Sequence, residues 1–316
     1  MLELVTDLVS MRNVKDVGEF LKRELVKARN LGQTATKDEG SGTAQSGVST
    51  TNEYRYLLIK SVNKITQLYP ETTPSMLEPL MDSFLGFEKK GSMASLETIM
   101  LVREIIEVYP DHRGVILTKL TNMIGQIRNH LVLKVAVWIL GEYSSTTSEI
   151  GDAFESIRSN IGSLPIFQET SEEENKTGDQ DQPKVITKTI ILPDGSYGTE
   201  TITVDPSKAK TDDEDFPLRK CLQSAEDDFL ASSVSISLAK LAVKMKKNLQ
   251  IKKFNALASE AALVICSLLK SKKKFADNTN SQRMQVCLKI LTSPASMLKS
   301  VNGVMKILSD QGRRIF

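Results

Sequence analysis

The stretch IKSVNKITQLYP, residues 59–70, is followed forty positions later by IMLVREIIEVYP, residues 99–110. Apolar residues recur at matching places in both stretches, three or four positions apart, which is the spacing of one face of an α-helix. The matched pairs are Ile59 and Ile99, Val62 and Val102, Ile65 and Ile105, and Leu68 and Val108. Each stretch ends at Tyr-Pro, and proline ends a helix because it lacks an N–H group.

A second helix follows in each unit, in which Leu77 and Leu80 correspond to Leu117 and Leu120. A unit of about forty residues with two helices is typical of HEAT and armadillo arrays. One helical hairpin cannot bury both of its apolar faces, so each unit needs a neighbour on either side. The sequence therefore predicts an all-α superhelix of stacked hairpins.

The same apolar spacing predicts the remaining helices. They are expected over residues 2–9, 14–29, 54–69, 76–87, 92–109, 113–127, 130–143, 150–161, 229–249, 254–269, 281–291 and 296–308, with helical structure resuming near Pro217. Thr73 is the expected N-cap of the helix over 76–87, with Pro74 in its first turn. Neither end of the array carries a polar capping repeat, so we expect a piece of a longer solenoid.

Two stretches interrupt the helical pattern. Residues 33–52 are rich in Gly, Ser and Thr and are expected to form a flexible insertion. Residues 166–216 are expected to form acidic linkers around one β excursion over 185–204, because β-branched residues there flank a turn at Asp194-Gly195. This divides the chain into helical repeats over 1–165, the excursion, and further repeats of the same solenoid over 217–316.

Composition and charge narrow the possible functions. The net charge is +2 and aromatic residues make up 5% of the chain, which argues against nucleic acid as a partner. Three widely separated cysteines imply no disulfide framework, so a reducing cytoplasm is expected. Cys266 and Cys287 lie in apolar helical runs and are expected to be buried. No segment is long and apolar enough to span a bilayer, so any membrane contact would be peripheral.

The sequence shows none of the common motifs of catalytic or cofactor-binding sites. His112 and His130 lie near different turns, without a paired cysteine or carboxylate motif, and are expected to face solvent. No phosphate-binding loop, nucleophile elbow or metal-ligand spacing occurs. The acidic clusters fall in linkers, which cannot hold a catalytic carboxylate rigidly. We therefore predict no enzyme, no cofactor and no metal site, but a scaffold that binds other proteins.

Lysines gather at both ends of the apolar helix expected over 254–269. They are Lys244, Lys246, Lys247, Lys252, Lys253, Lys270, Lys272, Lys273 and Lys274. Two interpretations stay open for them. They form either a solvated rim with favourable charge at helix C-termini, or a surface for an anionic membrane or an acidic partner.

Several segments resemble the trunk of the coatomer β-subunit family, which belongs to the COPI vesicle coat. They are LVSMRNV (8–14), FLKREL (20–25), WILGEY (138–143), DGSYGT (194–199) and LKIL (288–291). The WILGEY motif also occurs, with small changes, in large subunits of clathrin adaptors, whereas the DGSYGT loop is specific to coatomer. The resemblance covers nearly the whole chain, in order, and corresponds to the middle and C-terminal part of the trunk.

This resemblance implies a structural coat subunit in Golgi-to-endoplasmic-reticulum and intra-Golgi transport, cytoplasmic and peripheral on Golgi membranes and vesicles. Its implied partners are other coatomer subunits, especially the longin-like domain of the δ subunit. An Arf-type small GTPase binds the family largely outside the part represented here. The alternatives are a β-type clathrin adaptor subunit and an unrelated cytosolic HEAT scaffold.

The WILGEY motif itself has a structural interpretation that needs no ligand. Trp138 would fill the groove between neighbouring repeats, Gly141 would let two helices approach closely, and Glu142 would accept hydrogen bonds near the helix end.

Overall fold

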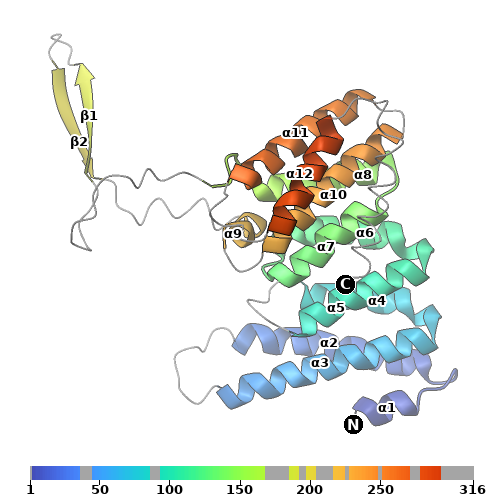
Figure 1. Ribbon diagram of the computed structural model, residues 1–316. Coiled ribbons are helices and arrows are strands. Elements are labelled where there is room, and N and C mark those ends of the chain that lie inside the picture. Colours follow the sequence, from blue (N-terminus) through green and yellow to red (C-terminus); the bar gives the residue numbers. More distant parts are fainter. Residues whose placement is uncertain are drawn as a thin grey trace.

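Two rows of stacked helices make up the computed structural model of the chain (Figure 1). The structure describes residues 2–35, 45–85, 93–167, 185–191, 197–203, 216–224, 228–247, 251–270 and 278–292. The helices of the first row are α2 (Val14–Ala35), α4 (Thr73–Phe84), α6 (Arg113–Met123) and α8 (Thr147–Ile161). Those of the second row are α1 (Leu2–Asp7), α3 (Gln45–Leu68), α5 (Met93–Val108), α7 (His130–Tyr143) and α10 (Asp228–Lys247). This arrangement confirms the predicted α-solenoid.

Beyond the rows, α10 packs against two further helices, α11 (Ile251–Lys270) and α12 (Asn278–Thr292), and all three contact one another. A short helix, α9 (Pro217–Gln223), lies against α8 where helical structure resumes as predicted. Short 3₁₀ turns, η1 (Pro70–Thr72), η2 (Pro110–His112) and η3 (Ile124–Gln126), complete the helical part.

The forty-residue repeat reappears in the backbone geometry. Tyr69 has φ −131° and ψ 80°, and its counterpart Tyr109 has φ −118° and ψ 85°. Each tyrosine precedes a 3₁₀ turn that begins at proline and leads directly into the next helix. The two Tyr-Pro stretches therefore build the same helix-turn-helix corner twice.

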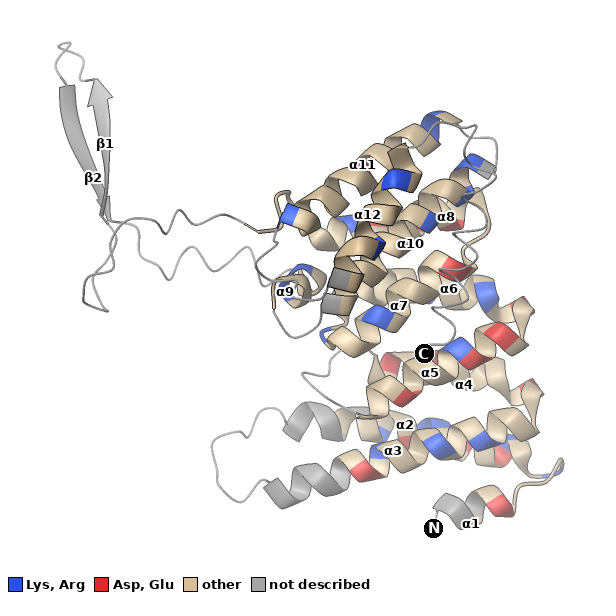
Figure 2. Ribbon diagram, in the orientation of Figure 1, with Lys and Arg blue, Asp and Glu red and all other residues tan. Residues whose placement is uncertain are grey.

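Polar contacts join each helix of the second row to the next. They are Lys64 Nζ to Asp7 (2.5 Å), Gln67 Nε2 to Glu104 (3.0 Å), the Tyr143 hydroxyl to Glu107 (2.8 Å) and Lys240 Nζ to Glu142 (2.8 Å). In the first row Lys119 of α6 reaches Asp82 of α4 at 2.8 Å. Figure 2 shows basic and acidic residues interspersed over the helices of both rows.

One apolar core runs through the helical part, from Val14 on α2 to Leu291 on α12. Its most enclosed member is α10, in which most side chains between Leu230 and Met245 are buried. Its buried residues include four serines and Lys240 as well as apolar side chains. Because α10 contacts α7, α8, α11 and α12, it joins α11 and α12 to the rows.

Three details of the sequence prediction are corrected. The insertion expected over 33–52 is shorter, since α2 continues to Ala35 and α3 begins at Gln45, with residues 36–44 outside the described part. Once a helix is nucleated by buried turns, each further residue adds a hydrogen bond, so polar Ser and Thr extend it. Thr73 is the first helical residue of α4 and not its N-cap, because the preceding 3₁₀ turn moves the cap to Thr72.

The third correction concerns α8, which begins three residues before the expected start at Ile150. Thr146 accepts a hydrogen bond from the Glu149 N–H, and the Glu149 carboxylate accepts one from the Thr146 N–H. This capping box satisfies two N–H groups that a helix start otherwise leaves without partners. The Thr-x-x-Glu spacing at 146–149 is a sequence signal that apolar periodicity alone overlooked.

The β excursion is a two-stranded antiparallel hairpin. Its strands are β1 (Val185–Ile191) and β2 (Tyr197–Thr203), with Ile191 opposite Tyr197 and Val185 opposite Thr203. The predicted turn at Asp194-Gly195 and the predicted linkers lie outside the described residues, as does the helix expected over 296–308.

Candidate functional site at the joint of α7 and α10

The WILGEY motif forms the last two turns of α7, where α10 crosses it closely. A Cβ atom added to Gly141 would lie 2.8 Å from the Ser237 Cβ and Oγ atoms and 2.9 Å from its Cα. Real Cβ atoms do not come so close to other heavy atoms, so only glycine permits this approach. The close helix contact predicted for Gly141 is present, and its partner is α10.

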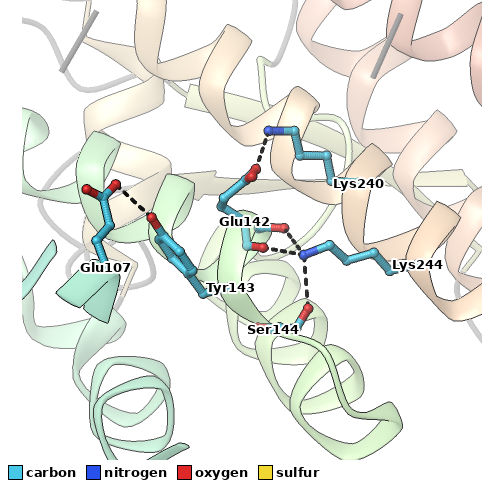
Figure 3. A network of polar contacts seen from close by, with 7 residues as sticks. Glu107, Glu142, Tyr143, Ser144, Lys240 and Lys244 are labelled. Atoms are coloured by element: carbon cyan, nitrogen blue, oxygen red, sulfur yellow. Dashed lines mark hydrogen bonds and ion pairs between the residues drawn. The ribbon is translucent and has the colours of Figure 1, made fainter. Parts of the chain in front are cut away.

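A buried ion pair lies beside this contact (Figure 3). Lys240 Nζ is 2.8 Å from Glu142 Oε2, and the two side chains are 6% and 13% exposed. Removing two charges from water is costly, and close pairing offsets much of that cost. Glu142 therefore acts as expected near the helix end, but its donor is an ammonium group about a hundred positions away in the sequence.

Lys244 completes the joint by capping the C-terminus of α7. Its ammonium donates hydrogen bonds to the backbone carbonyls of Gly141 (2.9 Å), Glu142 and Ser144 (3.0 Å). The last carbonyls of a helix have no partner within the helix, and a cation there also interacts favourably with the helix dipole. α10 thus supplies both the packing surface and the cap for α7.

Trp138 lies on the side of the motif that faces α5. It is 4% exposed, and its ring meets that of Tyr143 edge to face at a centroid distance of 5.8 Å. The Arg103 guanidinium of α5 lies over the Trp138 ring at 5.3 Å. This placement between neighbouring helices agrees with the groove-filling role predicted for Trp138, and Arg103 adds a cation–π contact.

A second polar cluster, centred on Arg219 of α9, was not predicted from the sequence. The Arg219 guanidinium is 7% exposed and donates to the backbone carbonyls of residues 161, 163, 165 and 166. Gln223 also donates to the Ile166 carbonyl, at 2.9 Å. These bonds join α9 to the segment that follows α8, so the described residues on either side of 168–215 are held together. An arginine two residues after Phe-Pro was the only local signal.

Among the lysines highlighted in the sequence, those that the structure describes do not form one surface. Lys244 caps α7, and Lys246 lies over the Phe254 ring at 4.8 Å. Lys252 and Lys253 are exposed at the start of α11, whereas Lys270 is exposed at its far end, about 26 Å away at 1.5 Å per residue. The side chains of Lys247 and of Lys272 to Lys274 lie outside the described residues. Among the described lysines the solvated-rim interpretation fits better.

The exposure of the cysteines and histidines agrees with the sequence prediction at some positions and differs at others. Cys287 is buried as expected, and burial raises the pKa of its thiol to about 12. Cys266 is exposed, contrary to expectation, because it falls on the outer face of α11. His112 and His130 are half-buried and not fully solvent-facing, and the His112 ring lies 6.3 Å from that of Tyr109.

The described residues hold neither a metal-ligand cluster nor a helix able to cross a membrane. They contain no group of three or more His, Cys, Asp or Glu side chains placed to hold a metal ion. No helix in the described ranges has both the length and the apolar character needed to cross a membrane. The charged and aromatic side chains of the joint are engaged with one another and with backbone carbonyls.

Comparison with known proteins assigns the chain to a family. The model of the adaptin N-terminal region matches residues 1–207, which is more than half of the chain. The chain belongs to the adaptin family. No solved structure matches it.

Among curated proteins, this adaptin-family chain is similar to coatomer β subunits. Coatomer subunit beta-1 of Oryza sativa is 29% identical over 318 residues, covering 95% of this chain and 32% of the relative. Coatomer subunit beta of Candida glabrata is 29% identical over 306 residues (92% and 30%), and that of Sus scrofa is 27% identical over 310 residues (95% and 30%). The resemblance seen in the sequence motifs is therefore confirmed, and the chain spans about a third of the length of these relatives.

Proposed function

We propose that this chain is a structural subunit of the COPI, or coatomer, vesicle coat, acting as a protein-binding scaffold and not as an enzyme. The adaptin match and the names of the relatives, all coatomer β subunits, support this assignment. The chain would act in Golgi-to-endoplasmic-reticulum and intra-Golgi transport. It would be cytoplasmic and reach Golgi membranes and vesicles peripherally, through its complex.

The observation that carries the proposal is the continuous core of the two helix rows, reinforced by the joint of α7 and α10. A solenoid with one core offers a long, rigid surface, on which affinity comes from many modest contacts and a few anchors. Such a surface suits a coat subunit, which must hold several partners in fixed relative positions.

The partners proposed are the other coatomer subunits, foremost the longin-like domain of the δ subunit. Binding of an Arf-type GTPase is proposed only for the assembled coat, because that family site lies largely outside the part represented here. A β-type clathrin adaptor subunit is the nearest alternative, since adaptins share the fold.

Co-expression of this chain with the δ longin-like domain tests the proposal. We expect a stoichiometric complex that survives size-exclusion chromatography. A variant lacking residues 185–204 tests whether the β hairpin takes part. Because Arg219 holds the ends of the excursion together, this deletion should leave the helical body folded, and circular dichroism checks that control.

A folded chain that does not co-purify with the δ domain would contradict the assignment. Parallel co-expression with the medium and small subunits of clathrin adaptors then tests the alternative directly. Failure of every pairing would leave an unrelated HEAT scaffold as the better interpretation.

A further inference from the structure

In three successive helices of the second row, the last residue or the first residue after the helix is apolar and exposed. Leu8, Leu68 and Val108 follow or complete α1, α3 and α5, and they are 74%, 57% and 57% exposed. We name these three residues the apolar stripe. Leu68 and Val108 are repeat equivalents that the sequence pattern grouped with the buried positions, and the structure exposes both.

The residues on either side of each stripe position show that the three places are structurally equivalent. The next residue in each case, Val9, Tyr69 or Tyr109, is partly buried against the core. The Tyr69 hydroxyl donates to the Val9 carbonyl at 3.1 Å, so the ends of α1 and α3 lie side by side.

The residue before each stripe position bonds to the next helix of the row. Asp7 pairs with Lys64, Gln67 bonds to Glu104, and Glu107 accepts from Tyr143. Packed helices lie about 8–10 Å apart, so the stripe extends over roughly 20 Å. Figure 1 shows the turns that follow α1, α3 and α5 along one edge of the stack, at the right of the view.

A single exposed apolar residue is common on protein surfaces, but exposed apolar residues at the same position of successive repeats require an explanation. Lys64 and Glu104, and likewise Gln67 and Glu107, occupy matching exposed positions within a turn of the stripe and are polar. Polar side chains are therefore compatible with the neighbouring exposed positions on this edge. Branched apolar residues at the ends of three successive helices indicate a surface that a partner covers.

The charge around the stripe indicates what kind of partner fits. Within four residues of the stripe positions there are five acidic residues, Asp7, Glu71, Glu104, Glu107 and Asp111, and two basic ones, Arg12 and Lys64. Lys64 is already paired with Asp7, and Glu107 is paired with Arg103 at 3.5 Å. Outside these two pairs, Glu71, Glu104 and Asp111 stand against Arg12. Glu71 and Asp111 are repeat equivalents, both exposed, on the 3₁₀ turns just after the stripe. The edge is net acidic and so favours a basic ligand.

We propose that the apolar stripe is a docking surface for a basic amphipathic helix of a partner protein, with apolar residues at every seventh position. Seven residues of an α-helix rise about 10.5 Å, which matches the spacing between neighbouring helices of the row. A helix lying across the helix ends thereby places one apolar residue on each stripe position. The proposal rests on the proposed function only in that the chain binds other proteins.

Two synthetic peptides of about 20 residues and identical Lys-, Ala- and Leu-containing composition serve as probes. In one the leucines stand at every seventh position, and in the other at every fifth, which scatters them around the helix. Fluorescence anisotropy with the full chain should show about tenfold tighter binding of the first peptide. That preference should weaken as salt is added, because charge contributes to binding.

The double variant Leu68→Ser, Val108→Ser should lose the preference between the two peptides. The matched control is Ile251→Ser, Leu263→Ser on α11, whose parent residues are similarly exposed, at 62% and 60%. The control should bind like the original chain, and both variants should keep its melting temperature because no buried group changes.

Equal affinity for the two peptides, or no binding of either, overturns the proposal, as does an equal loss in the control. Sedimentation showing a dimer that the stripe variant abolishes would assign the stripe to a second copy and also overturn it. These results are independent of co-purification with the δ domain, so failure of the stripe and failure of the coat assignment are distinguishable.

Discussion

Replacing Gly141 by alanine tests the joint of α7 and α10 most directly. In an unconstrained helix interior, glycine to alanine stabilises by roughly 0.5–1 kcal/mol, because it removes backbone freedom from the unfolded chain. At Gly141 the new Cβ would meet Ser237 at 2.8–2.9 Å, and one of the contacted atoms is the backbone Cα. A side-chain rotation cannot relieve a backbone contact, so α7 and α10 must separate.

Such overpacking costs about 1–3 kcal/mol. The net expectation for Gly141→Ala is a loss of roughly 1–2 kcal/mol in the free energy of unfolding. Gly151 on α8 is the matched control, because a Cβ there meets nothing within 4 Å. Gly151→Ala should stabilise by about 0.5–1 kcal/mol, so the two variants should differ by about 1.5–3 kcal/mol.

Urea unfolding followed by tryptophan fluorescence is a suitable assay. Trp138 is the single tryptophan of the chain and lies one helical turn before Gly141. Its emission therefore reports on the joint itself. If Gly141→Ala stabilises the protein as much as Gly151→Ala does, the close approach to Ser237 carries no energy and the reasoning about the joint is wrong.

Four further predictions concern individual side chains. Lys240→Met should cost about 3–5 kcal/mol, because it removes the ammonium group that pairs with the buried Glu142 carboxylate. Combining it with Glu142→Leu should recover a large part of that loss in a double-mutant cycle. Cys266 should react with a thiol reagent in the native state, whereas Cys287 should react only after unfolding, as mass spectrometry of labelled peptides would show. Burial raises the pKa of the Cys287 thiol from 9.0 to about 12. Below pH 9 the thiol is protonated in both the folded and the unfolded chain, so the free energy of unfolding does not depend on it. Between pH 9 and 12 the thiol ionises only in the unfolded chain, so the free energy of unfolding falls as the pH rises. Thr146→Ala should lower stability by about 1 kcal/mol and speed amide hydrogen exchange in the first turn of α8, and unchanged exchange there would contradict the role of the capping box.

Local patterns were sufficient for most of the helices. The forty-residue repeat and its Tyr-Pro corners predicted two units with the same geometry, and the structure reproduces them at Tyr69 and Tyr109. Helix ends were less certain, as α8 and the insertion over 33–52 show. An end depends on capping and on how far hydrogen bonding propagates, both of which extend beyond the apolar pattern.

The roles of the motif residues were predicted in kind but not in partner. The close packing of Gly141 and the accepting role of Glu142 followed from residue type near a helix end. That Ser237 and Lys240 meet them did not follow, because they lie about a hundred positions along the chain and beyond the β excursion. Lys244 belonged to a lysine cluster in the sequence, whereas in the structure it caps α7.

The sequence by itself determined the helical repeat, its period and the adaptin-like motifs, because helix periodicity and proline punctuation are properties of neighbouring residues. Only the tertiary structure decided that α10 packs against α7, that Arg219 closes the excursion, and that Leu68 and Val108 face solvent. Periodicity shows that a helix has an apolar face, but not which neighbour covers it. That choice depends on shape, charge and burial summed over elements that meet only when the chain is folded.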